Sequence, residues 1–207
     1  MMESEKLPYP GIIILAAGEG NRFGEAKQHV NFLGKEMWRH VHEKSISLLE
    51  NTNICVVGVD CKGGETRSES VMIGLGEMHP KTTRVVIIEA ARPLVTEEQI
   101  QKLLFDNHPS VSFVIPLVNS IISEDFQYIN RNEHMQLQTP QGFNFPLLKA
   151  AYDSKLFPDM TDETRVMHEF HGIEPKLLQG GINLFKVTYR EDLLIASVLS
   201  KGTEGMQ

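Results

Sequence analysis

The sequence predicts an α/β protein built around a mostly parallel sheet. Four short apolar runs rich in Val and Ile have the length of buried strands, at residues 12–15, 54–59, 85–88 and 111–115. Segments with helical periodicity lie between them, and this alternation favours parallel pairing because parallel neighbours need a crossover connection. The 207 residues, 41% of them hydrophobic and 23% charged, predict one domain over residues 1–207.

Helix signals fill the segments between and after these strands. Apolar residues recur at helical spacing over 37–49 and 70–78, and a capping box of Thr96 and Gln99 opens a helix over 97–107. Three further helices are predicted to begin at capping signals, which are Asn144 with Pro146, Thr161 with Asp162 and Glu163, and Thr188 with Glu191. The C-terminal part of the chain is therefore predicted to be folded.

Two connections depart from the simple alternation. Residues 118–137 are polar and lack helical periodicity, and their short apolar runs predict a projecting β-arm. Only Asp60 to Gly63 separate the strand at 54–59 from the next motif, and these are too few for a crossover helix. A peripheral strand–helix unit is therefore predicted to be missing.

Composition excludes several classes of protein. A formal charge of −7 argues against a nucleic-acid partner, because such a partner requires clustered cations over a wide face. The longest apolar stretch, residues 12–17, is far shorter than the ~20 residues of a membrane span, and it follows an acidic lead that contains proline rather than a basic one. Cys55 and Cys61 are too few for a disulfide framework. We therefore expect a cytoplasmic protein without a membrane anchor.

The loop after the first strand is suited to binding phosphate. Residues 16–28 combine small residues with Arg22 and Lys27 at the carboxyl end of the strand, where open α/β sheets bind ligands. Backbone N–H groups can approach phosphate oxygens there, and the two cations can neutralise the same anion. Phe23 stands where a dinucleotide fingerprint requires glycine, and the P-loop sequence is absent. A glycine-rich turn with two solvated cations explains this segment alone equally well.

Five separated segments decide between these interpretations. They are ILAAGEGNRFG at 14–24, GETRSESV at 64–71, IIEAARP at 87–93, QTPQGF at 138–143 and KVTYREDL at 186–193. Together, and in this order, they resemble the cytidylyltransferases that act on 2-C-methyl-D-erythritol 4-phosphate or on ribitol 5-phosphate. The resemblance implies a Rossmann-like nucleotidyltransferase fold with helices on both faces of the sheet.

The resemblance also implies an activity and a set of site residues. CMP would pass from CTP to a sugar or polyol phosphate, with Mg²⁺ as cofactor, pyrophosphate as the leaving group and a homodimer formed through the arm. The residues implied to bind the nucleotide are Ala16, Ala17, Gly18, Gly20, Gly64 and Ser70, and those implied to be catalytic are Arg22, Lys27 and Lys186. The residues implied to bind the acceptor are Arg92, Ser120, Arg131 and Thr139, and those implied to bind the metal are Glu89 and Asn183.

The chemistry of this reaction agrees with the residues present. An acceptor phosphate is already an anionic nucleophile, so no protein base is required. The obstacle is to bring two polyanions together, which positioning, Mg²⁺ and fixed cations overcome. Arg67 and Arg190 are interpreted alternatively as solvated surface charges, and Lys186 as a cover for apolar surface.

The metal ligands depart from the family pattern. Glu89 replaces an aspartate, and Asn183, which replaces a second carboxylate, offers only a neutral oxygen. This motivates a rival hypothesis, in which the chain is a degenerate member that binds nucleotide without turnover. For the acceptor, RNE at 131–133 and LFKVTY at 184–189 resemble the ribitol phosphate branch. We therefore expect an alditol phosphate such as ribitol 5-phosphate, with 2-C-methyl-D-erythritol 4-phosphate of isoprenoid biosynthesis as the alternative.

Overall fold

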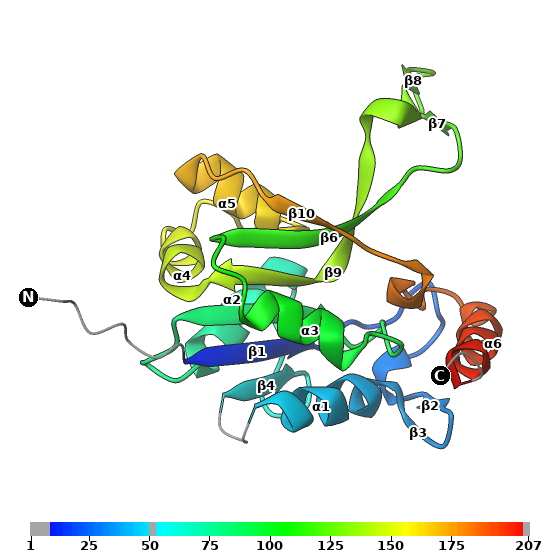
Figure 1. The fold of residues 1–207 in the computed structure, drawn as a ribbon, viewed down its shortest axis with the longest axis horizontal. Helices are drawn as coiled ribbons and strands as arrows, with labels where there is room; N and C mark the ends of the chain where they lie inside the picture. The colour runs from blue at the N-terminus through cyan, green and yellow to red at the C-terminus, as the bar shows by residue number, and fades with distance from the viewer. Residues whose placement is uncertain (1–8, 50–52, 205–207) are drawn as a thin grey trace, which may run out of the picture.

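The computed structural model describes residues 9–49 and 53–204, and its centre is a six-stranded sheet (Figure 1). The strand order is β10-β6-β9-β5-β1-β4. The bounds are β1 Pro10–Leu15, β4 Ile54–Val57, β5 Arg84–Glu89, β6 Ser110–Pro116, β9 Met135–Asn144 and β10 Lys176–Gln179. Strand β9 is antiparallel to both of its neighbours, and every other pairing is parallel. The prediction of a mostly parallel sheet is confirmed.

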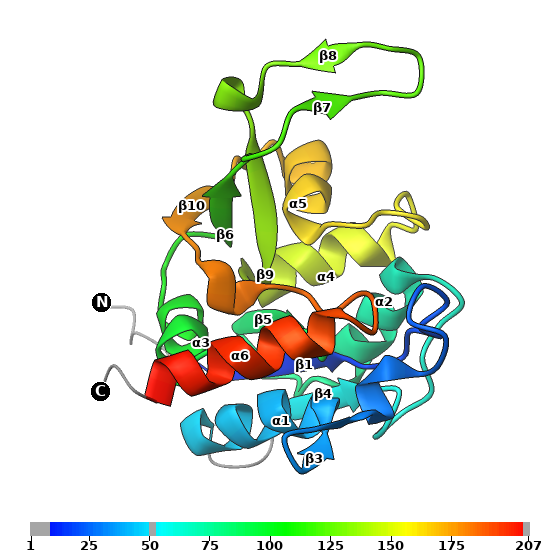
Figure 2. The ribbon, with the colours of Figure 1, turned by 90° about the vertical axis from the view of Figure 1, so that its right-hand side faces the viewer.

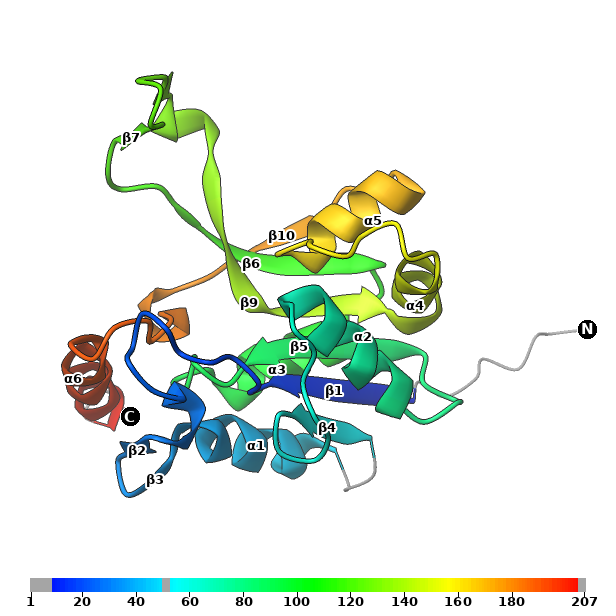
Figure 3. The same ribbon diagram turned by 180° about the vertical axis from the view of Figure 1, so that it is seen from behind.

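Helices cover both faces of this sheet. Helices α1 (Met37–Leu48) and α3 (Glu97–Leu104) pack on one face, where they share an apolar cluster with Ile12 and Ile14 of β1. Helices α2 (Arg67–Glu77), α4 (Phe145–Asp153) and α5 (Glu163–His171) pack on the other face, against Ile13 (Figure 3). Successive residues of a strand point to opposite faces, so β1 must be apolar at every position to serve both clusters.

The C-terminal helix lies at one end of the sheet. Helix α6 (Asp192–Glu204) follows the short 3-10 helix η3 (Ile182–Leu184) and lies beyond the carboxyl ends of β1 and β5 (Figure 2). Its Ala196 is buried in a small cluster with Phe23 and Phe32. The remaining short elements of this end are η1 (Lys27–His29), β2 (Asn31–Phe32) and β3 (Lys35–Glu36). The first loop and the C-terminal segment therefore pack together.

Helix boundaries differ from the prediction where capping was misjudged. Helix α2 begins at Arg67 rather than at residue 70, because Thr66 and Glu69 form a reciprocal capping box that the apolar periodicity does not reveal. The box predicted from Thr188 and Glu191 is wrong. Instead, the carboxylate of Asp192 accepts hydrogen bonds from the backbone N–H groups of Thr188 and Tyr189, at 2.7 and 2.8 Å. The caps at Thr96 and Asn144 are confirmed.

The connection after β4 is short, as predicted. Strand β4 lies at the edge of the sheet, and residues 58–66 contain no helix and lead directly to α2. The strand ends at Val57 rather than at residue 59, because Val59 and Asp60 turn back to donate backbone hydrogen bonds to the carbonyl of Val56. This leaves the start of α2 close to the carboxyl end of β1.

Residues 117–134 leave the sheet between β6 and β9 and project from the body of the protein (Figures 1 and 3). They contain the paired strands β7 (Ile121–Ile122) and β8 (Tyr128–Ile129), followed by η2 (Arg131–Glu133). Phe126 and Tyr128 are both about four-fifths exposed. Among the helices of the described residues, none is both long and apolar enough to cross a membrane.

Two glycines of α2 provide a test of how tightly the helix packs on β1. A Cβ atom at Gly74 would lie 2.6 Å from Cγ2 of Ile13, whereas one at Gly76 would meet no atom within 4 Å. We expect Gly74→Ala to lower the free energy of unfolding by about 1–3 kcal/mol through overpacking. We expect Gly76→Ala to raise it by about 0.5–1 kcal/mol through helix propensity. Urea unfolding measures both, and equal changes in the two variants would contradict the packing.

Candidate active site

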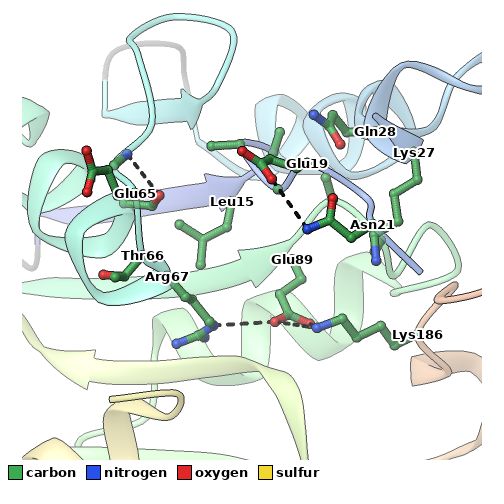
Figure 4. A pocket seen from close by; sticks show the side chains of 17 residues that line it. Leu15, Glu19, Asn21, Lys27, Gln28, Glu65, Thr66, Arg67, Glu89 and Lys186 are labelled. Carbon is green, nitrogen blue, oxygen red and sulfur yellow. Dashed lines mark hydrogen bonds and ion pairs between the residues drawn. The ribbon is translucent and has the colours of Figure 1, made fainter. Parts of the chain in front are cut away.

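A pocket of about 430 Å³ opens at the carboxyl ends of β1 and β5 (Figure 4). We call it the β1–α2 pocket, because the loop after β1 and the N-terminal turn of α2 form two of its walls. Its lining residues are Leu15, Ala16, Ala17, Gly18, Glu19, Asn21, Lys27, Gln28, Gly64, Glu65, Thr66, Arg67, Ser70, Glu89, Ala90, Ala91 and Lys186. Four of the five motif segments contribute to this list.

The wall after β1 presents backbone rather than bulky side chains. Ala16, Ala17 and Gly18 line the pocket, and a Cβ at Gly18 would meet nothing within 4 Å. Gly20 lies outside the lining and has a φ of 71°, and a Cβ there would come within 1.8 Å of the Glu25 carbonyl oxygen. Its role is therefore to turn the loop back toward Lys27, since only glycine fits this conformation.

The opposite wall is the start of α2. Gly64 and Ser70 both line the pocket, and the backbone N–H of Gly64 donates to Oγ of Ser70 at 3.2 Å. The capping box at Thr66 fixes this turn, and the helix N-terminus favours negative charge nearby. The structure thus brings together five of the six residues predicted to bind nucleotide.

The inner end of the pocket is organised around the carboxylate of Glu89, the last residue of β5. Lys186 Nζ lies 2.9 Å from both carboxylate oxygens, Arg67 Nε lies 3.4 Å from Oε1, and Arg92 Nε lies 3.6 Å from Oε2. Burial alone would raise the pKa of Glu89, but the charges of Lys186, Arg92 and Arg67 outweigh it and lower the pKa to about 2. Glu89 is therefore ionised at neutral pH.

Lys27 supplies a further cation beside this cluster. It is half-buried and lines the pocket, and both burial and the nearby charge of Lys186 lower its pKa. Arg22 is exposed and does not line the pocket, although its charge also contributes to lowering the pKa of Lys27. Two cations held near each other favour binding of an anion between them.

Arg67 is half-buried and held in an ion-pair network, so the hypothesis of a solvated surface charge is wrong for this residue. Its terminal nitrogens lie 2.5 and 2.8 Å from the two carboxylate oxygens of Glu163, which is fully buried. The hydroxyl of Tyr152 donates to the same carboxylate at 3.0 Å. Arg190, by contrast, is exposed and pairs with exposed Glu25, as the surface interpretation holds.

Two of the residues predicted to bind the acceptor, Arg92 and Thr139, are buried and contact each other outside the pocket lining, and Arg92 also contacts Glu89. Arg92 is buried, and its Nε donates to Oγ1 of Thr139 at 2.7 Å while Nη1 donates to the carbonyl of Leu184. The other two residues, Ser120 and Arg131, are exposed on the projecting arm and do not line the β1–α2 pocket. Arg131 donates instead to the carbonyl of Val118 within the arm.

The predicted metal ligands are not brought together. Glu89 lines the pocket, but Asn183 does not, because its side-chain amide is hydrogen-bonded to Gln99 and to the carbonyl of Leu94. An amide placed in this way has the role of joining η3 to α3. In this structure Asn183 therefore does not face the pocket that Glu89 lines.

The donors present fit a Mg²⁺ ion only together with a phosphate ligand. Oε2 of Glu89 is buried and makes no geometric hydrogen bond to the described residues, although Lys186 and Arg92 pair with it electrostatically, so it could bind a cation only if one arrives with its own anionic ligands. Within the described part of the chain, no group of three or more His, Cys, Asp or Glu side chains could hold a metal by itself. Mg²⁺ in nucleotide sites commonly takes one or two carboxylates and completes its octahedron with phosphate oxygens and water.

Comparison with known proteins gives the same family. A sequence model of the family described as 2-C-methyl-D-erythritol 4-phosphate cytidylyltransferase matches residues 37–201. A protein of that name from Thermotoga neapolitana is 29% identical over 93% of this chain and 97% of its own length. A protein of the same name from Haemophilus influenzae strain PittGG is 30% identical over 89% of this chain and 93% of its own length.

Solved structures agree on the fold. The crystal structure of a 4-diphosphocytidyl-2C-methyl-D-erythritol synthase from Anaerococcus prevotii superposes with a TM-score of 0.75 at 22% identity. The match covers 94% of this chain and 99% of that one. The predicted Rossmann-like nucleotidyltransferase fold is confirmed.

The prediction of a ribitol phosphate acceptor is wrong. The family model and the relatives with the names above are all cytidylyltransferases of 2-C-methyl-D-erythritol 4-phosphate. The two short segments that favoured ribitol lie on the arm and beside Lys186, and they cover far less of the chain than these matches. The chain is thus a nucleotidyltransferase and belongs to the 2-C-methyl-D-erythritol 4-phosphate cytidylyltransferase family.

Proposed function

We propose that this protein transfers CMP from CTP to 2-C-methyl-D-erythritol 4-phosphate, a step of isoprenoid biosynthesis. The observation that supports this most strongly is the β1–α2 pocket, in which small-residue backbone faces a group of cations around Glu89. Such a pocket complements a nucleotide whose triphosphate must lie against positive charge. Membership of the family supports cytosine as the base and 2-C-methyl-D-erythritol 4-phosphate as the acceptor.

Different residues of the pocket would contact the cytidine and the phosphates of the nucleotide. Backbone groups of Ala16, Ala17, Gly18 and Gly64, with Ser70, would hold the cytidine. Lys27 and Arg22 would bind the phosphates, and Lys186 would lie against the α-phosphate. Arg22 is exposed and outside the lining residues, so its contact requires the loop to close on the ligand.

The reaction needs charge neutralisation more than acid–base catalysis. An anionic oxygen of the acceptor phosphate attacks the α-phosphorus of CTP and forms a new P–O bond. The bond from the α-phosphorus to the oxygen bridging the β-phosphate breaks, and pyrophosphate leaves with that electron pair. Lys186 and Lys27 would stabilise the charge that builds up on these oxygens, in a position fixed before the reaction starts.

Glu89 is the residue that would hold a Mg²⁺ ion, because its carboxylate is the only buried one among the described residues that line the pocket. The remaining ligands would come from the phosphates and water, because Asn183 is turned toward Gln99. When bound, Mg²⁺ would neutralise part of the negative charge of the phosphates.

The acceptor would bind beside the triphosphate. Arg92 contacts both Glu89 and Thr139, and these two residues, Arg92 and Thr139, would hold the acceptor phosphate. Ser120 and Arg131 lie on the arm, so they would complete an acceptor site only in a second copy of the chain. We infer a homodimer joined through the arm, which the exposure of Phe126 and Tyr128 supports. The free thiols of Cys55 and Cys61 support a cytoplasmic location.

The test is pyrophosphate release from CTP and Mg²⁺ with three acceptors, namely methylerythritol, ribitol and glycerol phosphates. We expect release with 2-C-methyl-D-erythritol 4-phosphate and little with the other two. Faster release with ribitol 5-phosphate would overturn the assignment of 2-C-methyl-D-erythritol 4-phosphate as the acceptor. Saturable CTP binding without release for any acceptor would indicate a member that binds nucleotide without turnover.

Replacement of Lys186 tests the role of the charge at the α-phosphate. We expect Lys186→Gln to lower kcat about 100-fold with a much smaller change in KM for CTP, because the interaction strengthens in the transition state. The matched control is Lys102→Gln, since Lys102 is exposed on α3 and pairs with Glu98. Steady-state kinetics measure both variants, and equal activity in the two would contradict the assignment.

The pH dependence of stability tests the charge state of Glu89. Its pKa is lower in the folded protein than its ordinary value of 4.5, so its ionised form stabilises the fold above that value and this contribution is lost as the pH falls toward 2. Between pH 6 and pH 3, we expect wild type to lose about 2 kcal/mol more stability than Glu89→Gln. Urea unfolding at several pH values measures this, with Glu77→Gln on exposed α2 surface as control. Parallel curves for wild type and Glu89→Gln would show that the carboxylate is not held as described.

A further inference from the structure

Glu163 is a fully buried carboxylate outside the β1–α2 pocket, and the reaction as proposed does not use it. It is the first residue of α5 and follows the helix cap Asp162. Its partners are Arg67, which lines the pocket, and Tyr152 of α4. A buried charge is costly unless it is fully paired. Because one partner of Glu163 lines the pocket, we looked for an effect of Glu163 on the pocket.

Glu163 and Glu89 contact different nitrogens of the Arg67 guanidinium. Both terminal nitrogens of the guanidinium are taken by the two oxygens of Glu163, in a bidentate pair. Only Nε is left for Glu89, and its distance to Oε1 is 3.4 Å. Arg67 is thus held between two carboxylates and is strongly bound to the one outside the pocket.

Without Glu163, the guanidinium would have one carboxylate nearby. The fork of an arginine matches a carboxylate in two parallel hydrogen bonds, and this geometry is the strong one. Turned onto Glu89, it would contact Oε2, which in this structure pairs with Lys186 and Arg92 but not with Arg67. It would also compete with Lys186, whose Nζ lies 2.9 Å from both oxygens of Glu89.

We propose that Glu163 is a positioning residue that holds the fork of Arg67 away from Glu89, so that the carboxylate of Glu89 is not taken up in a bidentate arginine pair and can bind a cation that arrives with the substrate phosphates. Tyr152 supports this role by hydrogen-bonding the same carboxylate. The effect on the reaction rests on the proposed function, whereas the position of Arg67 does not.

The first experiment is a crystal structure of ligand-free Glu163→Gln. The replacement keeps the shape of the side chain and removes its charge. We expect the guanidinium of Arg67 to turn and contact both oxygens of Glu89. An Arg67 that stays beside residue 163, or turns into solvent without reaching Oε2, would overturn the proposal. This result does not depend on turnover.

The second experiment measures the Mg²⁺ requirement of pyrophosphate release at saturating CTP and acceptor. We expect Glu163→Gln to raise the Mg²⁺ concentration for half-maximal rate about tenfold, as is typical when a partner of a metal ligand is lost. The rate at saturating Mg²⁺ should change much less. Adding Arg67→Met in the same chain removes the competing fork and should restore the requirement to near that of wild type.

Controls separate positioning from a purely structural role. Glu169→Gln lies on the same helix, where Glu169 pairs with exposed Arg165, and should leave the Mg²⁺ requirement unchanged. Thermal unfolding shows whether each variant is folded, and Tyr152→Phe offers a milder change with a smaller shift in the same direction. Loss of stability and rate with an unaltered Mg²⁺ requirement, or no restoration in the double variant, would contradict positioning. Failure of wild type to release pyrophosphate would refute the proposed function. The crystal structure of Glu163→Gln would then still test whether Glu163 sets the position of Arg67.

Discussion

The active site depends on one buried carboxylate, that of Glu89, held among three cationic side chains. Burying a charge is unfavourable, and here the cost is offset because the cations come from three separate segments. Lys186 belongs to the C-terminal segment, Arg67 to α2 and Arg92 to the turn after β5. The contact that sets the charge of the pocket therefore also joins these segments at the carboxyl end of the sheet.

The same cluster prepares the pocket for a polyanion. Burial lowers the pKa of Lys27, and repulsion by the nearby positive charge of Lys186 lowers it further. The two acidic residues of the lining other than Glu89, which are Glu19 and Glu65, are exposed and so contribute little there. A triphosphate placed between the lysines relieves this repulsion, which gives the ligand-free site a specific preference for negative charge.

Much of the sheet and one wall of the pocket could be predicted from local sequence. Strand β1 had to be apolar at each position because both of its faces are covered, and its loop had to contain small residues where backbone meets the ligand. The start of α2 was misplaced because capping by Thr66 depends on side-chain geometry rather than on apolar spacing. The strand and its loop were predicted correctly because their causes lie within a few residues, whereas the equally local capping box of Thr66 and Glu69 was overlooked.

The parts of the site that depend on distant contacts were not predictable. Glu163 is 96 positions from Arg67 in the sequence, and a glutamate at the first turn of a helix has a sufficient local explanation in the helix dipole. Asn183 was expected to face a metal because of its place in a motif, but its hydrogen bonds to Gln99 could not be deduced from that motif. The acceptor was misjudged for a similar reason, since short matching segments outweighed the similarity of the whole chain.

The most direct measurement of the central claim is a crystal structure of the protein with CTP and Mg²⁺. We expect the triphosphate between Lys27 and Lys186, the cytosine against Gly64 and Ser70, and the metal on the carboxylate of Glu89. CTP bound away from the β1–α2 pocket, or bound there with its triphosphate directed away from both lysines, would contradict the central claim.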